Sequence, residues 1–290
     1  MGFFLDQVVN GVILGSQYAL IAAGLALIFG VAGIVNFAHG ELFMVAAYAL
    51  YLGESALGLP YAAAAVFTVI VMVPVGGLFY GVVIRPVAGA GWQKQLVATL
   101  AASIVMVNLA IVLAGSLPKT VSSPLAARVA VVGGVHFSLQ RVLILGCTLL
   151  SFAALHMFLM RAKWGKGMRA LAQNRSACAA VGIPVHRMGL LAVVIGSALA
   201  GVAGALIPVL SNITPTMGLL LTIKGFAAVI MGGFGNVTGA IVSGFALGLV
   251  EAMAMAYVSS AYADAFVFGA LIVTLLLRPQ GLFGHAVRVS

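Results

Sequence analysis

Long stretches without charged residues alternate with short polar stretches along this chain. No Asp, Glu, Lys or Arg occurs in residues 7–40, 55–84, 95–118, 142–160, 188–223 or 225–250. A helix needs about 20 predominantly apolar residues to cross the hydrocarbon core of a membrane. Each stretch can therefore hold a membrane-spanning helix, and the longer stretches can hold more than one.

Glycine, asparagine and isolated charges divide these stretches into segments. Gly33 and Asn36 interrupt the first stretch, and the glycine-rich sequence 231–236 interrupts the last. Residues 188–250 carry a single charge, Lys224, and are too long for two helices with ordinary loops, so we divide them into three segments. The predicted segments cover residues 8–30, 37–53, 61–84, 95–115, 142–160, 188–210, 217–231, 237–257 and 262–277.

These segments predict an all-α integral membrane protein, a polytopic helical bundle of about nine membrane segments in a single transmembrane domain, residues 1–290. We expect the segment at 217–231 to be short, tilted or broken. Asn36 and Asn236 each begin a segment after a glycine-containing break. This match predicts broken helices beside a pathway, and an internal repeat.

Composition supports the same class. The chain is 63% hydrophobic and 7% charged, with a mean hydropathy of +1.23. A soluble domain carries roughly 25% charged residues, so this chain cannot cover a water-facing surface and we expect lipid around it. The net charge of +9 could suggest nucleic acid as a partner. The cations sit at the ends of the predicted spans, however, so we interpret them as topology signals and expect no nucleic acid.

One basic segment, residues 161–187, holds six of the 14 Lys and Arg residues and no acid. Lys and Arg near span ends are retained on the cytoplasmic side, so we predict that 161–187 is a cytoplasmic loop. Counting crossings from it places the C-terminus inside and the N-terminus outside. Residues 116–140 then form an extracytoplasmic loop. Its sequence predicts a small hairpin of Val129–Val132 and Val135–Ser138 around a Gly133-Gly134 turn.

The hairpin loop has two interpretations, a disordered lid or a docking surface for a soluble partner, and the sequence favours neither. The basic segment is more specific, because residues 168–180 can form an amphipathic helix. Gly182 and Pro184 then give a helix stop. The expected apolar side holds Met168, Leu171, Ala172, Cys178 and Ala179; the expected polar side holds Arg169, Gln173 and Ser176.

The sequence offers little material for catalysis. It contains no HExxH, GxSxG or Walker A motif, and its two cysteines lack metal-ligand spacing, so we predict no catalytic residue, metal site or cofactor. If ATP drives the protein, another polypeptide must hydrolyse it. His39 and Glu41 could form an acid–base pair inside the membrane. We favour a place at a helix N-terminus near the inner surface, with Asn36 as the N-cap.

Two ionisable residues in predicted spans are functional hypotheses by default. Glu251 either serves a pathway, hydrogen-bonds inside the bundle or approaches the outer interface, and we favour the structural roles. Lys224 either reaches an interface with its ammonium group or lines the pathway. The polar residues assigned to a pathway or a structural role are Asn36, His39, Glu41, Lys224, Asn236 and Glu251.

Four motifs in one order give the chain a family resemblance. They are NFAHGEL (36–42), GMRALAQNRSA (167–177) with VGIP (181–184), KGFAAVIMGGFGNVTGA (224–240) and RPQGLFG (278–284). Together they resemble the permeases of high-affinity branched-chain amino acid ABC importers, specifically the shorter of the two permease subunits. The resemblance covers essentially the whole chain.

The resemblance implies a heteromeric importer in the bacterial cytoplasmic (inner) membrane. A second homologous permease, two cytoplasmic ATPase subunits and a periplasmic or surface substrate-binding protein would complete it. The resemblance also implies an ATPase-coupling helix that includes Met168, Arg169, Gln173, Asn174, Ala177 and Gly182. Relatives also serve urea, short amides or other amino acids. An alternative of another class is a stand-alone secondary transporter or channel, with Lys224, Glu251 and Asp264 as its candidate ion-coupling residues.

Overall fold

The computed structural model describes residues 2–132 and 135–284, and within them the chain is predominantly helical. The predicted Gly133-Gly134 turn lies outside the described residues. The elements are α1 (Gly2–Ala32), α2 (His39–Ser55), α3 (Tyr61–Phe79) with a π-helical turn (Tyr80–Ile84) and α4 (Arg85–Val87), α5 (Trp92–Ala114), β1 (Val129–Val132), β2 (Val135–Ser138), α6 (Leu139–Arg161), α7 (Lys163–Gln173), α8 (Arg175–Ala180), α9 (Val185–Leu206), α10 (Met217–Gly232), α11 (Val237–Tyr257) and α12 (Ala263–Leu277).

Every predicted apolar segment falls on a helix of the described residues. Seven helices in this part of the chain are long and apolar enough to cross a membrane. α2 has 17 residues and α10 has 16, so these two helices are shorter than a full span. The chain is a helical membrane protein, while the number of crossings and their orientation stay predictions.

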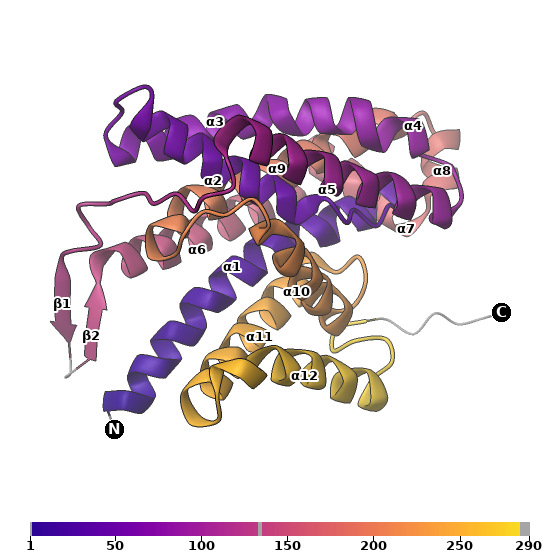
Figure 1. Ribbon diagram of the computed structural model, residues 1–290. Coiled ribbons are helices and arrows are strands. Elements are labelled where there is room, and N and C mark those ends of the chain that lie inside the picture. The colour runs from indigo at the N-terminus through magenta and orange to yellow at the C-terminus, as the bar shows by residue number, and fades with distance from the viewer. Residues whose placement is uncertain (1, 133–134, 285–290) are drawn as a thin grey trace.

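The central element of the bundle is α1, which is buried from Gly15 to Ile28 except at Gln17. It packs against α9, α10 and α11, with α2, α3, α5 and α9 on one side of it and α10–α12 on the other (Figure 1). Small residues allow the closest approach, as the spacing of Gly244 and Gly248 predicts. A Cβ added at Gly244 would lie 2.6 Å from Cα of Ala19, and one at Gly15 would lie 2.7 Å from Cα of Phe245.

The two short helices begin beside one another. The N–H of Gly40 in the first turn of α2 donates to Oγ1 of Thr222 in α10 (2.9 Å). A Cβ added at Gly40 would collide with the carbonyl oxygen of Gly218 at the start of α10. The sequence matched Asn36 with Asn236, the starts of α2 and α11. That match concerns a repeat and not a contact, so the approach of α2 to α10 does not test it, and the internal repeat stays a prediction.

The prediction of a single helix over residues 168–180 is wrong, because Asn174 separates α7 from α8. The backbone of Asn174 is extended (φ −154°, ψ 102°), and its Oδ1 accepts from the N–H of Ala177 at 2.9 Å. Asparagine side chains compete with helix backbone hydrogen bonds in this way, which favours a new N-cap over a continuous helix. Ala172 and Ala179, expected on the apolar side, are exposed.

The loop between α5 and α6 carries the small antiparallel pair of β1 and β2, in which Val129 faces Ser138. A second backbone pairing fixes the loop, since Lys119 and Ile213 exchange both N–H···O=C bonds at 2.9 Å. This pairing ties the loop to the chain just before α10. The hairpin and the N-terminus of α1 lie at one end of the bundle, and α7 and α8 lie at the other (Figure 1).

Candidate functional site

The basic segment folds back onto the bundle through α7. Met168 and Leu171 are buried. A Cβ added at Gly165 would collide with the carbonyl oxygen of Phe158, so the backbones of α7 and α6 touch. Of the residues assigned to a coupling helix, Met168 therefore anchors α7 and does not face outward.

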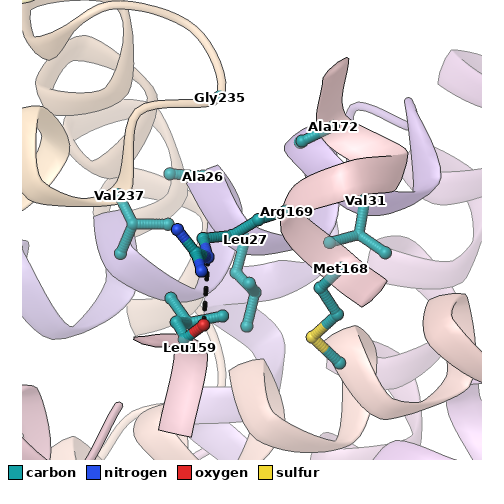
Figure 2. Close-up of a pocket in the computed structure, with 10 residues that line it drawn as sticks. Ala26, Leu27, Val31, Leu159, Met168, Arg169, Ala172, Gly235 and Val237 are labelled. Carbon is teal, nitrogen blue, oxygen red and sulfur yellow. Dashed lines mark hydrogen bonds between the residues drawn. The ribbon is translucent and has the colours of Figure 1, made fainter. Parts of the chain in front are cut away.

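Arg169 lies beside the contact between α6 and α7. Its Nε donates to the carbonyl oxygen of Leu159, 3.0 Å away, near the end of α6 (Figure 2). A small cavity of about 50 Å³ adjoins it, lined also by Gly235 and Val237 at the start of α11. Arg169 thus satisfies one of the carbonyl groups that a helix end leaves without an intrahelical partner. It braces α7 against α6 inside this chain.

Arg175, in the first turn of α8, makes the corresponding contact with the central helix. Its Nη1 donates to the carbonyl oxygen of Ala32, the last residue of α1, at 2.7 Å. A cation at a helix C-terminus also complements the helix dipole. The short helix α8 is therefore joined directly to the end of α1.

The part of the basic segment that projects from the bundle is α8 and its flanks. Gln173, Asn174, Ala177 and Gly182 are exposed, and the side chain of Val181 is 76% exposed. Gly182 has φ +81°, a left-handed conformation that favours glycine, and it ends α8 as predicted from the sequence.

Asn36, His39 and Glu41 lie deeper in the bundle than predicted. Oδ1 of Asn36 accepts from the N–H of Ala38 at 3.1 Å, and Ala38 itself is the N-cap of α2, so the predicted cap was two residues early. Oε1 of Glu41 accepts from Oγ of Ser103 at 3.0 Å. Ser103 stands in the middle of α5, so Glu41 faces the middle of a predicted span rather than its end. The expected position near the inner surface is therefore wrong.

His39 and Glu41 do not pair with each other in the described residues. The ring of His39 faces Gly24 of α1 and Gly196 of α9. Glu41 faces Ser103 and Gly218 instead. Both side chains are fully buried. Residues two apart on a helix point in different directions, which is why their proximity in sequence does not produce an acid–base pair.

Asn236 occupies the start of α11 in the role of a helix cap. Its Oδ1 accepts from the N–H of Gly239 at 2.9 Å, and its Nδ2 donates to the carbonyl oxygen of Phe283 at 3.1 Å. Asn236 thus joins the start of α11 to the chain beyond α12, a structural position at the end of the bundle that holds α7.

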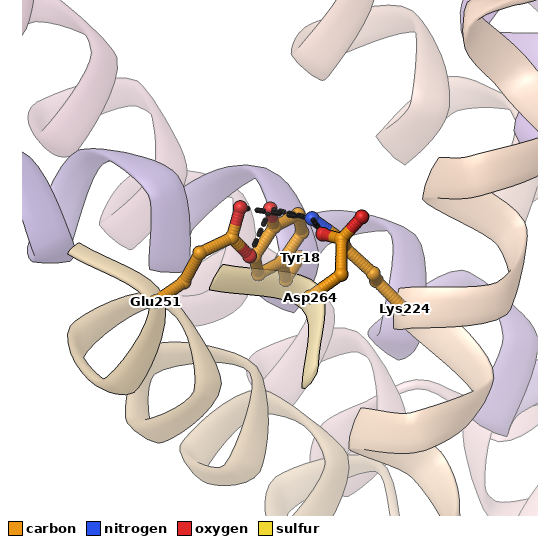
Figure 3. Close-up of polar contacts among 4 residues, drawn as sticks. All are labelled: Tyr18, Lys224, Glu251 and Asp264. Atoms are coloured by element: carbon orange, nitrogen blue, oxygen red, sulfur yellow. Dashed lines mark hydrogen bonds and ion pairs between the residues drawn. The ribbon is translucent and has the colours of Figure 1, made fainter. Parts of the chain in front are cut away.

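A polar quartet of three buried side chains and one exposed carboxylate joins four helices (Figure 3). Nζ of Lys224 in α10 lies 2.8 Å from Oε1 of Glu251 in α11 and 2.7 Å from Oδ1 of Asp264 in α12. The hydroxyl of Tyr18 in α1 donates to Oε2 of Glu251 at 2.7 Å. The side chains of Lys224 and Glu251 are 5% and 3% exposed, whereas that of Asp264 is 53% exposed.

The quartet brings together Lys224, Glu251 and Asp264, the three residues that the sequence offered as candidate ion-coupling residues. The ammonium group of Lys224 is held between the buried carboxylate of Glu251 and the exposed carboxylate of Asp264, and its place beside a pathway stays a prediction. Charged groups inside a membrane protein are costly unless they are paired in this way. Tyr18 and Ser103 were not predicted. Tyr18 lies 206 residues from Lys224 in sequence, and no local pattern marks such a pair.

Within residues 2–132 and 135–284, no group of three or more His, Cys, Asp and Glu side chains is placed to hold a metal ion. The arrangement instead consists of helix braces at one end of the bundle and an ion-pair cluster that runs from buried Glu251 and Lys224 to exposed Asp264.

Comparison with known proteins identifies the class of this membrane protein. The family model described as "Branched-chain amino acid transport system / permease component" matches residues 7–276. The chain is 33% identical over 296 residues to the high-affinity branched-chain amino acid transport system permease protein LivH of Escherichia coli (strain K12). That alignment covers 98% of this chain and 96% of LivH. It is also 33% identical over 295 residues to BraD of Pseudomonas aeruginosa, covering 97% of this chain and 96% of BraD.

The chain also aligns with a solved structure, PsaBC from Streptococcus pneumoniae in complex with Fab. The alignment covers 97% of this chain and 93% of the PsaBC chain, with 13% sequence identity and a TM-score of 0.48. The family follows from the sequence matches: this chain is a membrane permease and belongs to the permease component family of branched-chain amino acid transport systems.

The quartet predicts a specific pattern of stability. Lys224→Met leaves the carboxylate of Glu251 buried without its cation, a change that costs about 3–5 kcal/mol for buried pairs. We expect the thermal denaturation midpoint of the purified protein to fall clearly in Lys224→Met and to recover in part in Lys224→Met/Glu251→Gln. Lys94→Met, which removes an exposed ammonium group, is the matched control. A double variant less stable than Lys224→Met would contradict the pairing.

Proposed function

We propose that this chain is a permease subunit of an ABC importer that carries branched-chain amino acids across the bacterial cytoplasmic membrane. The full-length match to permeases with that named role carries the proposal. The absence of a Walker A motif from the sequence supports a division of labour, in which separate subunits bind and hydrolyse ATP.

The proposed assembly contains a second homologous permease, two cytoplasmic ATPase subunits and a periplasmic or surface substrate-binding protein. Lipid surrounds the apolar helices, and nucleic acid has no place in the assembly. The basic segment 161–187 faces the cytoplasm in this proposal, since Lys and Arg near span ends are retained there. The hairpin of β1 and β2 then faces the binding protein.

We assign contact with an ATPase subunit to α8 and its flanking residues, Gln173, Asn174, Ala177 and Gly182. This part of the basic segment is largely helical, is exposed apart from Cys178, and carries one cation, Arg175. Its link to the bundle supports the assignment, because Arg175 holds the end of α1 (2.7 Å). A displacement of α8 by a closing ATPase dimer would pull directly on the most buried helix. Arg169, also assigned to this element, would keep α7 and α6 moving together.

The coupling proposal predicts that a charge at the tip of α8 breaks the assembly. In Val181→Asp, a carboxylate replaces a side chain that is 76% exposed, so the fold of this chain should persist while an apolar contact with the ATPase subunit is lost. We expect co-purification of the ATPase subunit to fall at least tenfold, which corresponds to a loss of about 1.4 kcal/mol in the free energy of association.

Leu117→Asp is the matched control for Val181→Asp. Leu117 is 73% exposed at the other end of the bundle, and its replacement should leave ATPase association unchanged. Equal association of the ATPase subunit with Val181→Asp and with the unaltered chain would remove α8 from the coupling role.

The substrate and the energy source can be tested together in proteoliposomes. We expect ATP-dependent uptake of leucine, isoleucine and valine by the complete assembly, and no uptake when the ATPase subunits are omitted. Uptake of urea or acetamide in place of leucine would indicate that this permease belongs to the same family but carries another substrate. Uptake by this chain alone, without ATP, would contradict the importer and support a secondary transporter or channel.

A further inference from the structure

A cavity of about 290 Å³ lies between α1, α6, α9 and α11. Its lining comes from the first half of α1, the start of α6 and the end of α11, so it lies at the hairpin end of the bundle, opposite α7 and α8 (Figure 1). Ser211 and Met255 form an exposed part of its lining. Ligand sites typically measure about 300–1,000 Å³, so this cavity suits a small ligand.

One wall of the cavity is polar, which is unusual in so apolar a chain. Gln7, Asn10 and Gln17 line it from α1, and Arg141 lines it from α6. Nδ2 of Asn10 donates to Oε1 of Gln7 at 3.1 Å. Arg141 is half-buried and makes no hydrogen bond or ion pair within the described part of the chain. A guanidinium group in such a place favours an anionic partner.

The rest of the lining is apolar. Ile13 and Leu14 face the cavity from α1, and Ile207 and Leu210 face it from the turn that follows α9. Ile13 and Ile207 are buried. The cavity therefore combines one cation and several amide groups with branched aliphatic side chains. A ligand that fits carries a carboxylate, hydrogen-bond donors and a compact apolar group.

We propose that this cavity is a binding site for the zwitterionic branched-chain amino acid on the side where the permease receives it. Arg141 binds the carboxylate, and the side-chain oxygens of Gln7, Asn10 and Gln17 accept from the ammonium group. Ile13 and Ile207 pack against the branched side chain. The inference rests on the proposed function for the identity of the ligand, and it adds the place where that ligand binds.

The position of the cavity connects it with the polar quartet. Gln17 precedes Tyr18 on α1, and Ala252, which also lines the cavity, follows Glu251 on α11. A ligand seated here therefore lies beside the backbone that carries the quartet. Arg141 begins α6, which runs to the contact between Arg169 and Leu159 at the other end.

The test measures leucine binding to the purified complex of both permeases and the ATPase subunits in lipid nanodiscs, without the binding protein. We expect saturable binding of radiolabelled leucine and weaker competition by leucinamide, which lacks the carboxylate. In Arg141→Gln, leucine affinity should fall about tenfold or more, as expected when a charge-assisted hydrogen bond is lost. The preference for leucine over leucinamide should also disappear.

Arg128→Gln is the matched control, since it removes an exposed cation from the loop that precedes α6 and Arg128 does not line the cavity. Its leucine affinity should not change. If Arg141→Gln does not assemble, Ser211→Cys gives a second measurement, in which leucine should slow maleimide labelling of the exposed lining position.

Three outcomes overturn the site: no saturable leucine binding to the unaltered complex, an unchanged preference for leucine over leucinamide in Arg141→Gln, or labelling of Ser211→Cys that leucine does not slow. ATP-driven leucine uptake with the binding protein present is measured in parallel. Uptake without leucine binding would refute this site and leave the proposed function intact, whereas absence of leucine uptake would refute the proposed function itself.

Discussion

The close contact between the backbones of α1 and α11 is the constraint on which the bundle depends. Inside a membrane, lipid is as apolar as leucine, so helices associate through van der Waals packing rather than through burial from water. Gly11, Gly15 and Ala19 on α1 meet Gly244 and Gly248 on α11, where larger side chains would collide with backbone atoms. This approach encloses α1 among its neighbours and brings Tyr18 to Glu251.

α1 consequently reaches every candidate site at the two ends of the molecule. Its first half lines the cavity that holds Arg141, its middle supplies Tyr18 to the ion-pair quartet, and its last carbonyl accepts from Arg175 of α8. A rigid helix with three such attachments can connect the end proposed to receive substrate with the end proposed to meet the ATPase. The quartet also ties α10, α11 and α12 to this helix.

Much of the fold was predictable, because apolar stretches broken by glycine and charge mark membrane helices directly. Gly182 and Pro184 predicted where the helical part of the basic segment ends, although not its division into α7 and α8. Contacts between distant segments were not predictable: Lys224 meets Tyr18 across 206 residues, and no pattern near either residue records it. Asn174 has a side chain that suits a helix surface or a cap, and only its bond to Ala177 shows which applies. The family motifs identified the class but not the cavity.

The contact between α1 and α11 is tested most directly by comparing the thermal stability of two variants, Gly248→Val and Gly146→Val. A Cβ at Gly248 would collide with the backbone of Gly15, whereas one at Gly146 in α6 meets nothing within 4 Å. Overpacking of about 2 kcal/mol or more should lower the thermal denaturation midpoint of the purified protein by roughly 5 °C or more in Gly248→Val, with little change in Gly146→Val. Equal midpoints for the two variants would contradict the account.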